Sequence, residues 1–255
     1  MTAGPPALRT VAFGDLEGTA WGVGWFADPA GVALAALGGG AQATARPGLR
    51  LSAGADGDEW RLEGEGAALV VSPVGDAAPA RSVDGEIEGF DQLCRIVGRF
   101  ELDDSEQPVD CLGLRTWWTA PVDLERYESI RAVAAWFEPE DALALTAFRA
   151  RKAKGHGGDA AAGAVITPEG SPAVEDPRLS TTYEAQGWPV RAGVELWLAT
   201  PEDSEQQFPR RASGEATGPR VEGIADGGLE LRAEPFRWHS RGRDGAGIYI
   251  LARRR

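Results

Sequence analysis

The chain has 255 residues, 43% of them hydrophobic, which is enough apolar material for a buried core and excludes a disordered chain. Its length suits two β domains better than one core. The formal net charge of -13, from 39 acidic and 26 basic residues, repels nucleic-acid phosphates and anionic lipid head groups, so we expect no nucleic-acid partner.

The N-terminus and the cysteines favour a soluble, cytoplasmic protein. Residues 1–10 lack a basic region followed by an apolar stretch, so we expect no secretory signal. No window approaches the ~18 apolar residues of a membrane helix, so we expect no membrane insertion. Cys94 and Cys111 are too few for a disulfide framework, and whether they lie close in space is left open. The oligomeric state is left open as well.

Alternating apolar and small or polar residues predict antiparallel strands along the chain. Trp21, Val23 and Trp25 alternate with glycines, and the same period of two recurs over residues 190–198 and 229–234. The 34 glycines and 17 prolines punctuate the chain at short intervals, as expected for many strands joined by turns. The sequence therefore predicts an all-β fold of two antiparallel β-barrels or sandwiches.

The segments between these strands are rich in proline, glycine and acidic residues. Residues 72–86 and 167–177 are predicted to be loops, and residues 103–108 a hairpin turn. Residues 159–165 are the one stretch that we expect to form a short helix.

Two segments share a common pattern. Residues 25–37 read WFADPAGVALAAL, and residues 136–148 read WFEPEDALALTAF. Each predicts a hairpin with proline in its turn. A duplicated β domain would produce this echo, and so would chance in an alanine-rich chain. We place the domain boundary near residue 120, which gives domains 1–120 and 121–255.

Several motifs of enzyme chemistry are absent. The sequence has no GxxxxGK[ST] phosphate loop, no GxGxxG dinucleotide motif between a strand and a helix, and no GxSxG nucleophile motif. His156 and His239 are the only histidines, and no cysteine pair has metal-ligand spacing, which argues against a zinc site. We therefore expect neither a cofactor nor a bound metal.

Residues 235–249 are the densest candidate for chemistry. Phe236 and Trp238 alternate with Arg237 and His239, so a strand would place aromatic and basic side chains on opposite faces. His239 could act as a general acid or base, because free imidazole titrates near neutral pH. A structural histidine at a strand end is the alternative.

Residues 111–118, CLGLRTWW, form a second candidate. Arg115 beside Trp117 and Trp118 could make a cation–π shelf for a ligand carboxylate or carbonyl. A plug at the junction of two domains is the alternative, since such contacts also favour arginine and tryptophan. Residues 180–188, STTYEAQGW, form a weaker set on a predicted strand.

Asp15 and Glu17 form the third candidate. Their spacing would aim both carboxylates at one face of a strand, where two close carboxyl groups could share a proton and provide an acid catalyst. A solvated turn is the alternative.

Four longer segments together resemble a family of actinobacterial proteins that are similar to carotenoid hydratase (hydroxyneurosporene synthase) and to AttH-like proteins. The segments are GDLEGTAWGVGWF, GLRTWW, RLSTTYEAQG and FRWHSRGRDGAGIYILAR. The resemblance runs over most of the chain and implies two lipocalin-like β-barrels packed about a pseudo-twofold axis. It also implies hydrophobic substrates, since members of this fold include hydratases of isoprenoid chains and cyclases of the Diels–Alderase type. AttH-like proteins are richer in His and Asp at mid-chain, whereas residues 113–117 here contain neither, so no catalytic residue is carried over.

Three functions remain open. The first is binding of an isoprenoid, polyketide or acyl ligand in a Trp-lined barrel cavity, with Trp21, Arg115, Trp117 and Trp238 as ligand contacts. The second is a cofactor-independent hydratase or cyclase on such a ligand, with an acid among Asp15, Glu17 and His239. The third is a structural or interaction module whose interior is filled by side chains.

Overall fold

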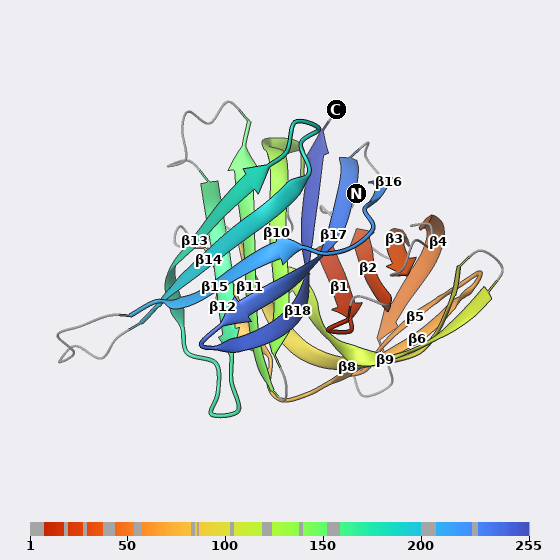
Figure 1. Ribbon diagram of the computed structural model, residues 1–255, viewed down its shortest axis with the longest axis horizontal. Helices are drawn as coiled ribbons and strands as arrows, with labels where there is room; N and C mark the ends of the chain where they lie inside the picture. Colours follow the sequence, from red (N-terminus) through yellow and green to blue (C-terminus); the bar gives the residue numbers. More distant parts are fainter. Residues whose placement is uncertain are drawn as a thin grey trace, which may run out of the picture.

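The computed structural model describes residues 8–17, 20–27, 30–37, 44–53, 58–82, 85, 87–102, 105–118, 124–137, 140–151, 159–199, 208–225 and 229–254. Within these residues the chain forms two antiparallel sheets and one short 3-10 turn, η1 (Leu124–Arg126). The prediction of an all-β fold is confirmed. The first nine strands along the chain form one sheet and the last nine form the other. The two sheets lie side by side in Figure 1.

The first sheet is a nearly closed barrel. Its strand order is β6-β5-β4-β3-β2-β1-β9-β8-β7, and an additional pairing of β8 with β6 brings the sheet back onto itself. The strands are β1 (Leu8–Gly14), β2 (Ala20–Ala27), β3 (Ala30–Leu37), β4 (Thr44–Ala53), β5 (Trp60–Gly64), β6 (Ala67–Pro73), β7 (Ala78–Arg81), β8 (Glu88–Leu102) and β9 (Ser105–Trp118).

The second sheet is a half-barrel. Its strand order is β12-β11-β10-β18-β17-β15-β14-β13, and β16 pairs with β17 beside this path. The strands are β10 (Tyr127–Phe137), β11 (Asp141–Ala150), β12 (Asp159–Ile166), β13 (Val174–Tyr183), β14 (Pro189–Leu198), β15 (Arg210–Ala216), β16 (Val221–Ala225), β17 (Leu229–Ser240) and β18 (Arg243–Arg254).

The two sheets have the same topology with an offset of nine strands. The strand pairings of β1 to β9 recur as β10 to β18, except that the β3–β4 pairing has no counterpart between β12 and β13 in the described residues. The contacts between sheets obey the same symmetry: β7 contacts β12 as β16 contacts β3, and β1 contacts β18 as β10 contacts β9. The predicted pseudo-twofold arrangement is confirmed.

The sequence echo does not follow this repeat. Both segments form the predicted hairpins, because β2 pairs with β3 and β10 pairs with β11. The topological counterpart of β2, however, is β11 and not β10. The two similar segments are therefore shifted by one strand relative to the structural repeat. Their residues match because both hairpins need the same local pattern.

Three buried clusters fill the molecule. The largest is the seam between the two sheets, where Trp21, Val23 and Trp25 face residues of the second sheet. A second cluster fills the interior of the barrel, and a third fills the half-barrel. The glycines that alternate with Trp21 and Trp25 are needed because aromatic rings of the barrel interior cover them; a Cβ at Gly22 would lie 2.4 Å from the Phe13 ring.

Four local predictions need correction. The helix expected over residues 159–165 is wrong: this segment is β12, because Ala162 and Ala164 pack in the seam while Val165 packs in the half-barrel, and this two-sided burial outweighs the helix propensity of alanine. The loop expected at 72–86 contains β7, and the loop expected at 167–177 ends earlier, since β13 begins at Val174. The turn at 103–108 joins β8 to β9 as expected but is shorter, since β9 begins at Ser105. The boundary placed at residue 120 lies outside the described residues.

Candidate functional site

Asp15 and Glu17 lie in the turn after β1. This strand ends at Gly14, so the prediction that both carboxylates share one face of a strand is wrong. The Asp15 amide donates a hydrogen bond to the Ala20 carbonyl (3.1 Å), and the Ala20 amide donates to the Asp15 carboxylate (3.2 Å). These two bonds close the turn and leave Glu17 exposed.

A pocket of about 310 Å³ opens beside this turn, at the seam between the two sheets. The first sheet contributes the turn itself and parts of β8 and β9, and the second sheet contributes Trp136 of β10. The Trp136 indole N–H donates to the Gly14 carbonyl (3.2 Å), which ties the two sheets together at the pocket. We call this the seam pocket; it is lined by Gly14, Asp15, Leu16, Glu17, Arg95, Asp110, Cys111, Leu112 and Trp136.

The seam pocket has an apolar wall and a charged rim. Leu16, Leu112 and Trp136 supply the apolar surface, and the rim includes an ion pair of 2.7 Å between Arg95 and Asp110. Burial raises the pKa of the Cys111 thiol to about 12, so this thiol is not ionised near neutral pH and is a poor nucleophile. Cys111 and Cys94 occupy neighbouring strands, and both are free thiols.

Arg115 and Trp117 face the interior of the barrel. Arg115 lies on β9 and is 3% exposed, and its guanidinium stacks 4.7 Å from the centroid of Trp60 instead of on its two sequence neighbours. Trp118, one residue beyond Trp117, faces the seam and packs edge-on against Phe148 at 5.6 Å. The three residues of this sequence motif therefore divide between two cores.

Trp238 is buried in the interior of the half-barrel. Its ring stacks on Phe236 at 5.6 Å, and Phe236 stacks on Tyr249 at the same distance. The Tyr249 hydroxyl bonds to Thr181 (2.9 Å) and to Tyr183 (3.2 Å), which places part of the weaker sequence candidate in this network. Burial raises the pKa of Tyr249 well above its ordinary value, so the phenol stays neutral and can donate a hydrogen bond.

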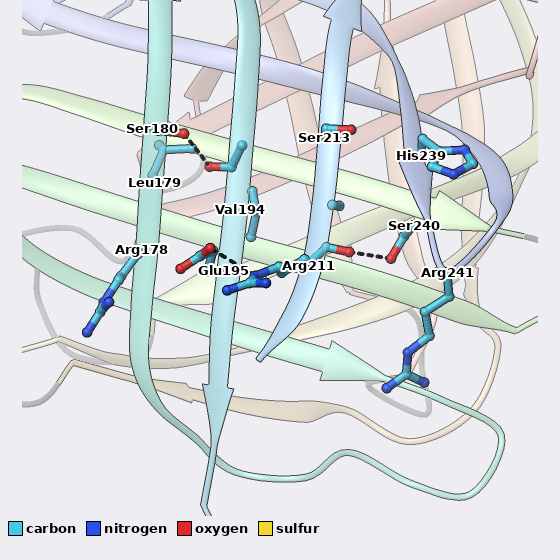
Figure 2. A pocket seen from close by; sticks show the side chains of 12 residues that line it. Arg178, Leu179, Ser180, Val194, Glu195, Arg211, Ser213, His239, Ser240 and Arg241 are labelled. Carbon is cyan, nitrogen blue, oxygen red and sulfur yellow. Dashed lines mark hydrogen bonds and ion pairs between the residues drawn. The ribbon is translucent and has the colours of Figure 1, made fainter. Parts of the chain in front are cut away.

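His239 lies on the outer face of the half-barrel, because its side chain points away from the interior that Trp238 faces. It lines a shallow hollow of about 640 Å³ over β13, β14, β15 and the end of β17. Figure 2 shows the side chains that line this hollow, with His239 next to Ser240 at the end of β17. Ser180 and Ser213 form part of the floor, and an ion pair of 2.9 Å between Arg211 and Glu195 borders it. His239 itself contacts Asp244 at 3.0 Å, and its side chain is 58% exposed.

The predicted residues are thus not assembled in one site. Asp15 and Glu17 line the seam pocket with Trp21 buried nearby, Arg115 and Trp117 belong to the barrel, Trp238 belongs to the half-barrel, and His239 belongs to the outer face. Alternation predicts which residues share a face of a strand. It does not predict whether that face lies in the seam, in the interior of the barrel or half-barrel, or on the outer surface.

Two buried carboxyl groups with a raised pKa were missed by the sequence reasoning. Asp91 lies in β8 and Glu234 in β17, both 2% exposed, and burial raises the pKa of each to about 7. Glu234 accepts a bond from Arg220 (3.0 Å), and its second oxygen has no hydrogen-bond partner. The alternation over residues 229–234 predicted this strand, but it does not indicate that both faces of β17 are buried.

The described residues contain no cluster of His, Cys, Asp and Glu that could hold a metal ion, and no helix long and apolar enough to cross a membrane. His156 lies outside the described residues.

No family model and no curated protein matches this sequence. Solved structures do match its fold along nearly the whole chain. An AttH-like protein from Nitrosomonas europaea superposes with a TM-score of 0.65 at 14% identity, over 99% of this chain and 93% of that one. CghA superposes with a TM-score of 0.65 at 13% identity, over 98% and 89%. Kievitone hydratase from Nectria haematococca superposes with a TM-score of 0.60 at 7% identity, over 97% and 88%.

These likenesses establish the fold alone. The expected similarity to AttH-like proteins of the lipocalin-like two-barrel fold is confirmed at this level. CghA has also been solved with Sch210972, and in that form it superposes with a TM-score of 0.62 at 13% identity.

Proposed function

We propose that this protein binds a hydrophobic small molecule in the seam pocket. The observation that carries the proposal is a pocket of about 310 Å³ whose apolar wall is built from both halves of a duplicated fold. This volume lies at the lower end of the range for ligand sites, about 300–1,000 Å³. A structure of the same fold that was solved with Sch210972 supports the binding of a small organic molecule.

The chemistry of the pocket favours an apolar ligand with one or two polar groups. Leu16, Leu112 and Trp136 offer an apolar surface, and the carboxylates of Asp15 and Glu17 at the rim can accept hydrogen bonds from ligand hydroxyl groups. Oxygenated isoprenoids, small polyketides and fatty acids have this composition.

Binding is tested by titrating the protein with carotenoids, shorter isoprenoids and fatty acids while tryptophan fluorescence is recorded. Trp136 lines the pocket, so we expect saturable quenching by at least one compound. The variant Leu112→Arg places a charge in the apolar wall and should abolish this quenching. Val97→Arg, at a side chain that is 46% exposed in the same barrel, is the matched control. Equal quenching of both variants would contradict the seam pocket as the site.

A cofactor-independent hydratase or cyclase is the second candidate, favoured by the two carboxyl groups at the rim of an apolar pocket. Protonation of an alkene needs an acid beside the double bond, and aromatic rings such as Trp136 stabilise the resulting cation. We expect Asp15→Asn combined with Glu17→Gln to abolish turnover of a bound alkene and to leave its affinity within about threefold of the unmodified protein, less than 1 kcal/mol. Unchanged turnover in the double variant would rule out this assignment.

A further inference from the structure

The barrel interior contains a buried arginine without an ion pair. Arg115 is 3% exposed, and its Nε and Nη2 atoms both donate to the Gln92 side-chain oxygen, at 3.0 and 2.6 Å. Its Nη1 donates to the backbone carbonyl of Asp58. These acceptors are neutral, so they orient the guanidinium without cancelling its charge. Burial lowers the pKa of Arg115, and the weaker electrostatic influence of Cys94 and of the Asp58 carboxylate opposes that effect.

A second arginine lies at the same end of the barrel. Arg9 is the direct neighbour of Trp117 across β1 and β9, and its guanidinium stacks 4.7 Å from the Trp117 ring. The Nε of Arg9 and the indole nitrogen of Trp117 are both buried, and neither has a hydrogen-bond partner among the residues that the structure describes. Two buried N–H donors therefore lie side by side without an acceptor, which is a costly arrangement for a polar group.

Three arginines of the half-barrel form ion pairs instead. Arg210 pairs with Asp141 at 2.7 Å, Arg232 pairs with Glu230 at 2.7 Å, and Arg131 pairs with Asp159. Among the described residues, no carboxylate forms an ion pair with Arg9 or Arg115. In a protein with a net charge of -13, two cations without an ion-paired carboxylate among the described residues indicate a place for an external anion.

Aromatic rings surround these donors. Trp117 packs edge-on against Trp60 at 6.4 Å and against Phe90 at 5.9 Å. Arg9, Phe90 and Trp117 are half-buried, so this end of the barrel is reached from solvent, whereas Trp60 is buried. An apolar group can therefore lie against the exposed parts of these rings while an anionic group meets the N–H donors.

We propose that this end of the barrel, formed by Arg9, Trp60, Phe90, Arg115 and Trp117, is a second ligand site that takes a flat organic carboxylate. The carboxylate oxygens accept from the Arg9 Nε and the Trp117 indole N–H, and the charge of Arg115 stabilises them from within the barrel. The ring of the ligand packs on Phe90 and Trp117. The side chains that fill the barrel leave no depth for a long chain, which favours an aromatic acid.

This site is separate from the seam pocket. Arg9 and Gly14 lie near opposite ends of β1, and five residues of strand span roughly 17 Å. The proposal does not depend on the ligand of the seam pocket, and the two can fail separately.

The test is isothermal titration calorimetry with 2-naphthoate and with 2-naphthalenemethanol, which has the same rings but no charge. We expect 2-naphthoate to bind at least about tenfold more tightly than the alcohol, or 1.4 kcal/mol. Arg9→Met keeps a linear apolar side chain over Trp117 and removes the charge, and it should weaken 2-naphthoate binding about tenfold without changing the affinity for the alcohol.

Arg61→Met is the matched control, because Arg61 follows Trp60 in the chain but is 51% exposed and pairs with Glu59. It should bind 2-naphthoate as the unmodified protein does. The combined Asp15→Asn and Glu17→Gln variant should also bind normally, which separates this site from the seam pocket. Equal affinity for the two probes, no binding of 2-naphthoate, or equal losses in the Arg9 and Arg61 variants would each overturn the proposal.

Discussion

Single carboxyl groups influence the stability of this protein through burial. Asp91 faces the seam, where the Thr116 hydroxyl donates to it at 2.5 Å. That one bond favours the ionised form, but removal from water acts more strongly, so the pKa rises from 3.8 to about 7. Glu234 follows the same logic in the half-barrel, where Arg220 only partly offsets its burial. Both groups bind protons more tightly in the folded state than in the unfolded chain.

The stability of the folded state should therefore fall as the pH rises. Between pH 3.8 and about 7 the folded protein holds a proton on Asp91 that the unfolded chain has lost, and this difference is on the order of 4 kcal/mol by pH 8. Asp91→Asn keeps an acceptor for Thr116 and cannot ionise. We expect this variant to lose less stability than the unmodified protein between pH 5 and pH 8 in urea unfolding, and to be the more stable of the two at pH 8.

Asp76→Asn is the control for this experiment, because Asp76 is exposed in the same half. It should leave the pH dependence unchanged. A parallel pH dependence of the Asp91 variant and the unmodified protein would show that Asp91 is ionised in both states.

At the scale of the strand, close contacts with neighbouring side chains explain why some positions require glycine. Gly214 on β15 lies under the Trp238 ring, and a Cβ there would come within 2.7 Å of it. Gly193 on β14 also has a near neighbour at 2.7 Å, but that neighbour is the Ser180 hydroxyl on the outer face. The two glycines lie on neighbouring strands of the same sheet. The main difference between them is what a methyl group added at each position would contact.

We predict that Gly214→Ala destabilises the protein by about 1–3 kcal/mol, because the Trp238 ring is fully buried, stacks on Phe236 and lies against Gly247, so it cannot move aside. Gly193→Ala should change the stability by less than about 0.5 kcal/mol, because the Ser180 side chain can rotate away. Thermal unfolding of both variants compares the two. Similar losses would mean that the strand itself, and not the ring, requires glycine.

At the scale of the whole molecule, the seam joins the two sheets into one core. Residues of both sheets form a single buried cluster, and Trp118 of β9 meets Phe148 of β11 across it. Neither sheet buries this face by itself. The largest apolar surface of each half is therefore covered only when the other half is folded, which predicts cooperative unfolding.

The variant Trp118→Ala should cost about 3–5 kcal/mol and leave a single transition when far-UV circular dichroism and tryptophan fluorescence are followed in urea. Trp197→Ala is the control, since Trp197 is half-buried and contacts Arg178 on the outer face at 5.4 Å; it should cost about 1 kcal/mol. Two separated transitions in the unmodified protein would mean that the halves fold independently.

The sequence by itself determined the elements that depend on local pattern. Alternation identified the strands around Trp21 and Leu196, and the proline-containing turns identified two hairpins, because side chains of a strand repeat every two residues whatever surrounds it. The resemblance of longer segments indicated the two-barrel fold. The candidate residues Asp15 and Glu17 were found from the spacing of two carboxylates on a predicted strand, although they lie in the turn after β1.

Only the tertiary structure decided what each strand face encloses. Trp21, Trp117 and Trp238 have the same kind of alternating neighbours, yet they lie in the seam, the barrel and the half-barrel. The burial of Asp91 and Glu234, and the absence of an ion pair for Arg9 and Arg115 among the described residues, depend on strands far apart in the chain. Local pattern specifies two faces of a strand, but solvation and charge compensation are set by what packs against each face.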